Sequence, residues 1–567
     1  MRLSTDEDRD EVLALETIAA AARAGITVFD TARAYGRGPE ELGHNERLLA
    51  RALRQCGADE SARIVTKGGM TRAGGGWIPD GRARTIRADC EASLAALDGL
   101  AIDLYLIHAP DSRVPWPTSV RALARLADDG LVRRVGLANV NRRELDEALE
   151  LAPVAAVQVA VSPYDDRALR GGVVSRCAEA GVALIAHSPL GGPRRAAGLA
   201  RREALAEVAG AHEASAAEVA LAWLLGLGAG VVAIPGARRP ETARSAARAA
   251  RLRLTAGDRA LLARAFGRAR PTRLEHPRSS PTDNADVVLV MGIPGAGKTR
   301  VAEEYVSRGY LRLNRDGRGG TLRELANALG ESLSSGVRRV VLDNTYLTRA
   351  ARNDVIETAS RHQAPTRCVW LDTPLAQAQV NLVERMLDRF GSLPTPEELK
   401  RLARSQPGGL APTSQMRAFR ELEPPSSDEG LSAIEQVPFV RMPPPRPAQV
   451  GVFVAAAAMR HSNWEHALEL GATGAPHLVF DWSPDGTPDD LAEVADLLSA
   501  KISGLIDTAL CAHAAGPPSC WCRPPLPGLP LAFARSHGVD PSISVVIGTG
   551  PAQRTLANAL GARYVHI

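Results

Sequence analysis

The chain has no long apolar run, few cysteines and almost no lysine. No hydrophobic stretch approaches the roughly 18 residues that a membrane-spanning helix needs, so we expect no membrane partner. The N-terminus, MRLSTDEDRDEVLAL, is acidic and helical rather than signal-like, and we therefore expect a cytoplasmic protein. The seven cysteines, three of which fall between 511 and 522, do not have the spacing of a disulfide framework.

Lysine is scarce enough to be informative. Of the 68 basic residues only four are lysines, namely Lys67, Lys298, Lys400 and Lys501. Two of them, Lys67 and Lys298, fall in motifs whose chemistry requires an ammonium group. The net charge of +4, spread over 567 residues, says little about partners.

The length and two linker-like stretches predict several domains, because 567 residues are too many for one hydrophobic core. Residues 268–286 are rich in Pro, Ser and Arg without periodicity, and residues 440–449 contain a proline run. They divide the chain into parts at 1–270, 286–440 and 450–567.

The first part alternates helical stretches with seven short apolar strands, which are GITVFD, ARIVTK, DLYLIH, RRVGLAN, VAAVQVA, VALIAHS and GVVAIPG. Their even spacing predicts an α/β fold of the (β/α)₈ barrel type. A doubly wound sheet is the structural alternative, but it does not require so regular a spacing. The first barrel strand is not visible, so either a short strand precedes this start or the barrel is open on one side.

Four polar residues follow these strands at the end where barrel enzymes carry their chemistry. They are Asp30, Tyr35, Lys67 and His108. Lys67 beside Tyr35 would lower the pKa of the phenol, Asp30 would keep Lys67 charged, and His108 would orient a carbonyl oxygen. Together they predict an acid catalyst that protonates a carbonyl oxygen.

The segments GITVFDTARAYG, NERLL, TKGG, DLYLIHAPD and AIPGARRPET together resemble the aldo-keto reductases over about 1–270. The resemblance implies an NADP(H)-dependent reductase of a small carbonyl substrate, with the four polar residues as its catalytic tetrad. It also implies cofactor contacts at the nicotinamide amide, the pyrophosphate and the 2′-phosphate, made by Asn139, Gln158, Ser188, Leu190, Gly236, Arg238 and Arg239. Relatives often stack a tyrosine on the nicotinamide, whereas this chain has His187 there.

The second part opens with a phosphate-binding motif. DVVLVMGIPGAGKTR is an apolar strand, a Walker A loop and the start of a helix, which predicts a P-loop parallel sheet that binds ATP and Mg²⁺. In such a loop backbone N–H groups surround the phosphates, the lysine reaches the β- and γ-oxygens and the threonine holds Mg²⁺. The corresponding residues are Gly292, Gly295, Gly297, Lys298 and Thr299. A second apolar strand ends at Asp343, where a Walker B carboxylate would organise Mg²⁺.

LRLNRDGR, RRVVLDNTYLTRAAR and the helix after RCVWLDTP resemble the kinase module of polynucleotide kinases. The resemblance implies that Asp316 is the general base toward a 5′-hydroxyl of RNA or DNA. It also implies that Arg385 or Arg389 is the lid arginine on the γ-phosphate. Gly319 stands where that family has a substrate arginine.

Charge is compatible with a nucleic-acid acceptor but does not prove one. Residues 286–420 carry 20 basic and 14 acidic residues, a difference of +6, which suits a phosphate-rich partner. The arginine excess also fits ordinary surface solvation, and the same P-loop core serves small-molecule kinases. Both alternatives stay open.

The last part contains four metal-ligating residues at close spacing, Cys511, His513, Cys520 and Cys522. Three thiolates and one imidazole predict a closed tetrahedral Zn²⁺ site. Because four protein ligands leave no open position, we expect this zinc to be structural.

This loop and the CRPPLPGL that follows resemble the small phosphatases of the haloacid dehalogenase superfamily, which implies a Rossmann-like domain. The resemblance implies that relatives have two catalytic aspartates, a lysine and a Mg²⁺-binding aspartate at four positions. This chain has Ala455 and Ala457, Pro524 and Thr549 at those positions. The hydroxyl expected after the second strand is replaced by Asp481 or Trp482. We therefore expect a phosphatase-like domain without catalysis.

Three functional hypotheses result. The first is a reductase joined to a polynucleotide-type kinase and an inactive phosphatase-like domain, with nucleic-acid end repair as the function by analogy. The second makes the barrel a nicotinamide sensor that regulates the kinase, which His187 and the missing strand favour and the intact tetrad opposes. The third is a small-molecule kinase fused to a metabolic reductase.

Overall fold

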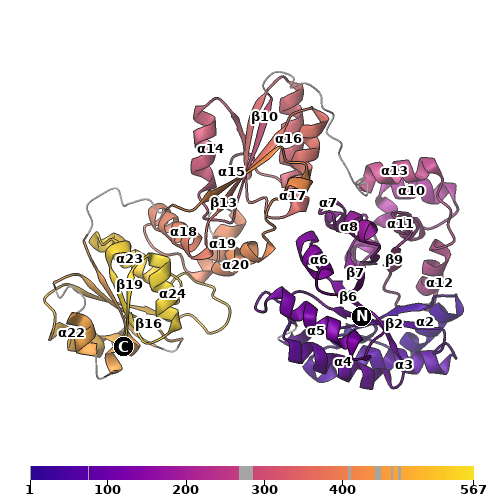
Figure 1. Ribbon diagram of the computed structural model, residues 1–567, viewed down its shortest axis with the longest axis horizontal. Coiled ribbons are helices and arrows are strands. Elements are labelled where there is room, and N and C mark those ends of the chain that lie inside the picture. The colour runs from indigo at the N-terminus through magenta and orange to yellow at the C-terminus, as the bar shows by residue number, and fades with distance from the viewer. Residues whose placement is uncertain are drawn as a thin grey trace. The chain divides into compact units, whose positions relative to one another are not determined.

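The computed structural model describes residues 2–73, 76–266, 285–405, 410–440, 449–461, 464–469, 474–484 and 486–567. The chain divides into two compact units, Met1–Pro277 and Arg278–Ile567 (Figure 1). Most residues of the two expected linkers, 268–286 and 440–449, lie outside the described residues.

The first unit is built on one parallel sheet with the strand order β1-β2-β5-β6-β7-β8-β9. The strands are β1 (Val28–Asp30), β2 (Arg63–Gly68), β5 (Ile102–Ile107), β6 (Val135–Ala138), β7 (Val154–Ala160), β8 (Ala183–His187) and β9 (Val231–Ile234). They are the seven strands expected from the sequence. Because β1 and β9 are the two edges of this sheet, the described residues form a nearly closed barrel of seven strands.

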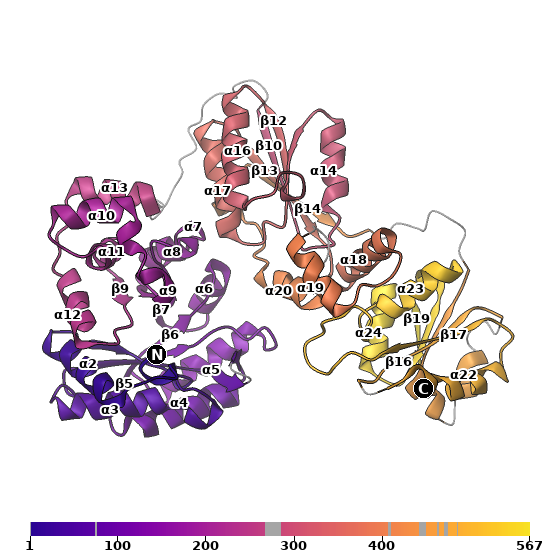
Figure 2. The same ribbon diagram turned by 180° about the vertical axis from the view of Figure 1, so that it is seen from behind.

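Helices connect the strands and surround the sheet (Figures 1 and 2). They are α1 (Arg2–Thr5), α2 (Glu11–Arg23), α3 (His44–Gln55), α4 (Ala83–Leu97), α5 (Trp116–Asp128), α6 (Arg142–Leu149), α7 (Arg167–Arg170), α8 (Val173–Ala180), α9 (Pro193–Ala196), α10 (Glu203–Ala211), α11 (Ala216–Leu225), α12 (Pro240–Ala249) and α13 (Ala256–Phe266). A hairpin of β3 (Met70–Ala73) and β4 (Gly76–Pro79) follows β2.

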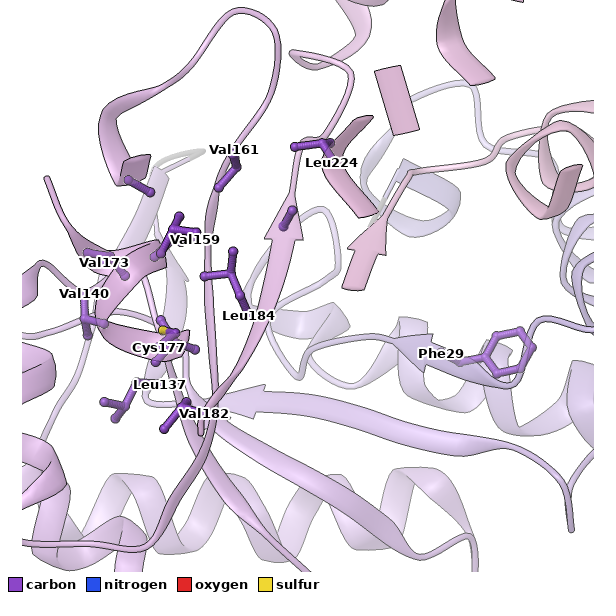
Figure 3. Packing of buried hydrophobic residues seen from close by; sticks show 14 of the residues in the cluster. Phe29, Leu137, Val140, Val159, Val161, Val173, Cys177, Val182, Leu184 and Leu224 are labelled. Carbon is purple, nitrogen blue, oxygen red and sulfur yellow. The ribbon is translucent and has the colours of Figure 1, made fainter. Parts of the chain in front are cut away.

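The barrel strands are apolar because both of their faces are buried. One set of side chains, including Val65, Leu106 and Ile185, forms a cluster in the barrel interior. The alternate set packs outward against the helices. Leu184 of β8 and Cys177 of α8, both labelled in Figure 3, belong to this outer core.

The second unit contains two parallel sheets of five strands. The first has the order β11-β12-β10-β13-β14. Its strands are β10 (Asp286–Met291), β11 (Leu311–Leu313), β12 (Arg339–Asp343), β13 (Thr366–Asp372) and β14 (Ala433–Pro438). Its helices are α14 (Lys298–Ser307), α15 (Arg315–Arg318), α16 (Leu322–Ser334), α17 (Arg349–Arg361), α18 (Leu375–Phe390), α19 (Pro396–Ser405) and α20 (Pro412–Glu421). Figure 2 shows α14 on one face of the sheet and α16 and α17 on the other.

The other sheet has the order β17-β16-β15-β18-β19, with the first strand of this part in the centre. Its strands are β15 (Val452–Ala455), β16 (His477–Trp482), β17 (Ile506–Cys511), β18 (Val545–Gly548) and β19 (Arg563–His566). Its helices are α21 (Trp464–Glu469), α22 (Ala492–Ser499), α23 (Gly528–His537) and α24 (Pro551–Leu560). This is the Rossmann-like arrangement expected from the sequence.

The helix α18 joins the two sheets of the second unit into one body. Its residues Val383, Met386 and Leu387 share a buried core with Phe453 and Phe480 of the last sheet. The two parts that the sequence separated at 440–449 therefore pack against each other.

Candidate active sites and metal centre

The period of two along each barrel strand places the polar residues of the first site. Val65, Leu106 and Ile185 point into the barrel interior. Lys67 and His108 come two residues after Val65 and Leu106, so they are on the same face one step nearer the carboxyl end. The strands thus deliver their polar residues to one end of the barrel, as the sequence predicted.

Lys67 is the centre of this cluster and is completely buried. Its ammonium nitrogen lies 2.6 and 2.8 Å from the two carboxylate oxygens of Asp30 and 2.7 Å from the carbonyl oxygen of Thr31. The Tyr35 hydroxyl is 3.5 Å away. Burial lowers the pKa of Lys67, but Asp30 and Tyr35 outweigh it and the pKa is raised overall, which keeps the ammonium charged.

Tyr35 and His108 face the same space with ring centroids 5.7 Å apart. Burial raises the pKa of the Tyr35 phenol, while Lys67 acts in the opposite direction. The lowering by Lys67 that the sequence predicted is therefore present but smaller than the effect of burial. Burial and the charge of Lys67 lower the pKa of His108 to about 3, so its imidazole is neutral at ordinary pH.

Asp30, Tyr35 and His108 line a cavity of about 900 Å³. Trp77 of the β3–β4 hairpin also lines it, with its ring centroid 5.9 Å from the rings of both Tyr35 and His108. Sequence reasoning missed Trp77 because it lies on a hairpin between strands rather than at a strand end. The cavity presents a proton donor, a neutral imidazole and an aromatic wall, which suits a small carbonyl compound.

The residues expected at the nicotinamide amide lie in the same cavity. The side-chain amide of Gln158 donates to Asp30 over 2.7 Å. Asn139 donates its amide to the carbonyl oxygen of His108 over 2.9 Å, and its side-chain oxygen lies 3.0 Å from His187 Nε2. Asn139 has a φ of 57°, a left-handed conformation that asparagine tolerates better than most residues.

The residues expected along the rest of the cofactor are divided between the cavity and the surface. Ser188, Leu190 and Gly236 line the cavity. Arg238 lies outside it, 3.2 Å from Asp6 Oδ2 and 3.5 Å from Asp8 Oδ1. Arg239 is the residue before α12. A 2′-phosphate at Arg238 would therefore have to compete with two carboxylates.

The Walker A loop follows β10 and ends at α14 as expected. Gly292, Gly295 and Gly297 have φ values of 153°, 87° and 93°, which other residues rarely adopt. A Cβ on Gly295 would lie 2.2 Å from a backbone oxygen of α18, so close packing also requires glycine there. Lys298 donates to the carbonyl oxygens of Gly292 and Ile293, both over 2.9 Å, which folds its side chain over the loop.

Charged groups from separate elements converge on Lys298. Burial, together with the charge of Arg385, lowers the pKa of Lys298 to about 8 against the opposing charges of Asp343 and Asp316. Asp316 lies exposed on α15, and its charge also acts on Arg385 of α18. Arg389 follows Arg385 by one helical turn, so both arginines are on one face of α18. Asp343, Asp316 and Arg385 thus lie near enough to Lys298 for their charges to act on its pKa.

Asp343 ends β12 opposite Val290, beside the strand that leads into the Walker A loop. Its two carboxylate oxygens accept hydrogen bonds from Arg312 of β11 over 2.9 and 2.7 Å. Thr299 is exposed in the first turn of α14. These oxygens fit a Mg²⁺ site in type, with Arg312 fixing the orientation of the carboxylate. Sequence reasoning missed Arg312, although its place on the strand next to Asp343 was a signal.

Three side chains bind carbonyl oxygens of the Walker A loop from outside the motif. Asn381 of α18 donates to Gly295 over 2.8 Å, Gln415 of α20 donates to Pro294 over 2.8 Å, and Thr373 donates to Ala296 over 3.2 Å. Sequence reasoning missed all three because they come from segments far along the chain.

The four predicted metal ligands come together at the end of β17 and in the loop that follows it. Cys511 Sγ lies 3.7 Å from Cys520 Sγ, 3.4 Å from Cys522 Sγ and 3.5 Å from His513 Nδ1, and Cys522 Sγ lies 3.2 Å from His513 Nδ1. All four ligand atoms are within 4.8 Å of one another. Bond lengths to zinc imply sulfur–sulfur edges of about 3.8 Å and sulfur–nitrogen edges of about 3.6 Å in a tetrahedron. The residues present therefore fit a four-coordinate zinc ion.

The carboxyl edge of the last sheet holds the positions that the sequence assigned to lost phosphatase residues. Ala455 ends the central strand and is 2% exposed. Asp481 and Trp482 end β16, and Thr549 follows β18. Pro524 follows the metal loop. Aligned in this way, the edge presents methyl groups where a D-x-D pair would stand.

Comparisons with known proteins agree with the barrel and identify it as one of the reductase class. Residues 1–265 match the family model described as the aldo/keto reductase family. The probable aldo-keto reductase 1 of Glycine max is 33% identical over 242 residues, with coverage of 37% of this chain and 67% of that protein. The chain therefore belongs to the aldo-keto reductase family.

Two solved structures are also similar to this chain. A thermostable aldo-keto reductase, Tm1743, solved with the inhibitor epalrestat, is 32% identical, with 46% of this chain and 90% of that chain covered and a TM-score of 0.40. An aldo/keto reductase from Klebsiella pneumoniae, solved with NADP and acetate, is 25% identical, with 46% and 87% covered and a TM-score of 0.39.

Residues 287–406 match a second family model, described as an AAA domain. The match covers the Walker A loop and four strands of its sheet, β10 to β13, so the chain carries a kinase-like P-loop domain after the barrel. Within the described residues, no helix has the length and apolarity needed to cross a bilayer.

Proposed function

We propose that the barrel reduces a small carbonyl compound with NADP(H) and that Tyr35 donates the proton. The observation that carries this proposal is the position of the buried Lys67 ammonium between both oxygens of Asp30 and the Tyr35 hydroxyl. A nicotinamide bound in the cavity would supply the hydride. Lys67 stabilises the phenolate that forms as Tyr35 gives up its proton, and neutral His108 can donate a hydrogen bond to the carbonyl oxygen.

The test is hydride transfer by the full chain. NADPH deuterated at its transferable position is incubated with a panel of aldehydes and ketones, and the alcohols are analysed for deuterium. Deuterium on the carbinol carbon with the natural protein and not with Lys67→Met supports the proposal. NADPH binding without transfer to any carbonyl compound would instead favour the nicotinamide sensor.

We further propose that the P-loop domain transfers the γ-phosphate of ATP to a hydroxyl of an anionic acceptor, with the 5′-hydroxyl end of RNA or DNA as the preferred one. The convergence of Asp316 and Arg385 on Lys298 supports this function. Asp316 can accept the hydroxyl proton, Lys298 and Arg385 can stabilise charge on the transferred group, and Arg389 and Arg318 add positive charge at the rim.

Label transfer from γ-labelled ATP to a 5′-hydroxyl oligonucleotide tests this second function. Lys298→Ala and Asp316→Asn serve as variants, and Lys400→Ala, outside the site, is the matched control. Labelled 5′ ends that both site variants abolish support the proposal. ATP hydrolysis without end labelling, or competition by small alcohols, would favour a small-molecule acceptor.

We also propose that the last sheet carries a zinc-bearing, phosphatase-like fold without phosphatase activity. Its strand order, its metal loop and the alanines at the end of β15 support this view. Metal analysis showing one zinc per chain and no hydrolysis of phosphate monoesters is the expected result. End repair of nucleic acid would then draw on the kinase alone.

A further inference from the structure

The metal loop carries a buried tryptophan that reaches the P-loop domain. Trp521 lies between the ligands Cys520 and Cys522 and is 1% exposed. Its indole packs in the core shared by the last sheet and α18, with Met386 and Leu387 among its members. The side chain that the metal loop holds is thus part of the interface between the two halves of the second unit.

A chain of hydrogen bonds continues from this tryptophan to the phosphate-binding loop. Trp521 Nε1 donates to the carbonyl oxygen of Leu410 over 2.9 Å. Leu410 directly precedes the turn into α20, whose Gln415 is completely buried and donates to the carbonyl oxygen of Pro294 over 2.8 Å. Three residues therefore connect the metal loop with the Walker A loop.

Other contacts hold the same surfaces together. The amide of Gln377 in α18 donates to the carbonyl oxygen of Ala559 in α24 over 3.0 Å, and Arg535 of α23 forms an ion pair with Asp388 of α18. One helical turn after Gln377, α18 also supplies Asn381, which donates to the carbonyl oxygen of Gly295. Helix α18 and the residue Leu410 before α20 therefore both contact the last sheet or its metal loop.

We propose that metal binding at Cys511, His513, Cys520 and Cys522 positions the phosphate-binding loop through Trp521 and Gln415. When bound, zinc would fix the backbone on both sides of Trp521 and so fix where its indole meets Leu410. Without it the loop loses its cross-link, Trp521 leaves its place more often, and α20 no longer holds Pro294. Trp521 and Gln415 are positioning residues, since neither reaches the γ-phosphate-binding groups.

The proposal explains why a domain without catalytic residues would keep a metal site. A P-loop fixes phosphate through backbone N–H groups, so its affinity depends on the loop conformation being held in advance. In this chain part of that support comes from beyond residue 410, outside the segment that matches the AAA domain. The consequence for nucleotide binding rests on the proposed kinase function, whereas the mechanical link does not.

Amide hydrogen exchange of the full chain, with zinc bound and after chelation in the absence of nucleotide, tests the link directly. We expect exchange within residues 410–421 and 292–299 to become about tenfold faster without zinc, which is what the loss of one buried hydrogen bond allows. Residues 1–266 should be unchanged and serve as the internal reference. An increase confined to residues 506–526 would overturn the proposal.

Two matched substitutions separate the effect of the Trp521–Leu410 hydrogen bond from the effect of the metal itself. Trp521→Phe keeps a buried ring but removes the N–H that Leu410 accepts, and should raise exchange at 292–299 at full zinc content. Trp482→Phe makes the same change at the residue whose Nε1 donates to the carbonyl oxygen of His513 over 2.9 Å, away from α20. At full zinc content this variant should leave the exchange of residues 292–299 unchanged. Equal effects of the two substitutions would contradict the proposed path.

Nucleotide affinity gives the functional readout. If the zinc-loaded natural protein binds ATP, then Trp521→Phe, Gln415→Leu and zinc removal should each weaken ATP binding by about tenfold. If the zinc-loaded natural protein binds no ATP, the kinase function fails while the exchange result still decides the structural link. ATP binding that stays unchanged in all three cases, with unchanged exchange, would refute the proposal.

Discussion

The Arg312 guanidinium holds the Asp343 carboxylate through two parallel hydrogen bonds, from Nε over 2.9 Å and from Nη2 over 2.7 Å. Asp343 is nearly buried, and the pair lies beside the strand that leads into the Walker A loop. This geometry fixes the carboxylate in one orientation. Arg312 would therefore be a positioning residue of the proposed Mg²⁺ site.

Replacing Arg312 should therefore weaken Mg²⁺ use more than it weakens nucleotide binding. We expect Arg312→Gln to raise the Mg²⁺ concentration needed for half-maximal kinase activity by about 10- to 100-fold, as for other residues that orient metal ligands. A titration of activity with Mg²⁺ at saturating ATP measures the effect. Arg312→Lys keeps the charge but not the two parallel hydrogen bonds, so its Mg²⁺ requirement should lie between those of the natural protein and Arg312→Gln. A lysine variant with the Mg²⁺ requirement of the natural protein would contradict the proposal that Arg312 orients the Asp343 carboxylate.

ATP binding should depend on pH through Lys298. Burial lowers the pKa of Lys298 to about 8 in the free protein, and phosphate oxygens close to the ammonium will raise it in the complex. Affinity is then constant below pH of about 8 and falls as pH rises above it, by at most about tenfold per unit. Binding of ATP followed by calorimetry from neutral to alkaline pH gives the profile. Lys298→Arg, which does not titrate in this range, should bind with little pH dependence.

The acidic pair on Arg238 should tune cofactor choice. Asp6 and Asp8 compete with a 2′-phosphate for this guanidinium, and both contacts are at least partly exposed to solvent. We expect Asp6→Asn together with Asp8→Asn to lower the KM for NADPH by about two- to fivefold, the size of surface ion pairs, without changing the KM for NADH. Steady-state kinetics with both cofactors measure this. In a protein that already carries Arg238→Ala, adding the same two acidic changes should not alter the KM for either cofactor.

A buried ion pair should govern the stability of the second unit. Arg352 is completely buried and donates to both oxygens of Glu429 over 2.8 and 2.7 Å, which ties α17 to the segment before β14. Arg352→Met leaves the Glu429 carboxylate buried without its partner and should lower the free energy of unfolding by about 3–5 kcal/mol.

Calorimetry of the full chain tests this, since the barrel provides an independent transition for reference. Replacing both residues, Arg352→Met with Glu429→Met, should recover much of the lost stability because no uncompensated charge remains. A double variant as unstable as the single one would show that the pair stabilises the unit through its packing rather than through the compensation of its charges.

The sequence predicted the parts of the fold that depend on local pattern. Asp30, Lys67 and His108 each end an apolar strand, and parallel strands deliver their ends to one edge, so their proximity followed from spacing alone. The Walker A loop was equally readable because its glycines and Lys298 are consecutive. The metal site followed from four ligands within twelve positions of chain.

Contacts between distant segments could not be predicted. Gln415 reaches Pro294 across more than a hundred residues, and nothing in the composition of α20 indicates it. The sequence also separated the last two parts at a proline-rich stretch. It did not show that α18 is apolar on two sides and fills a second core with Val383 and Met386. Proline content marks where a chain is extended, whereas packing decides whether the flanking parts stay together.

The most direct test of the account is NADPH oxidation by the full chain with an aldehyde substrate, measured for the natural protein and for Tyr35→Phe. In the proposed mechanism Tyr35 supplies the proton, and Phe keeps the ring in place. We therefore expect a loss of about 10²- to 10⁴-fold in kcat with NADPH binding unchanged. A Tyr35→Phe variant that reduces the aldehyde as fast as the natural protein would contradict the assignment of the barrel site.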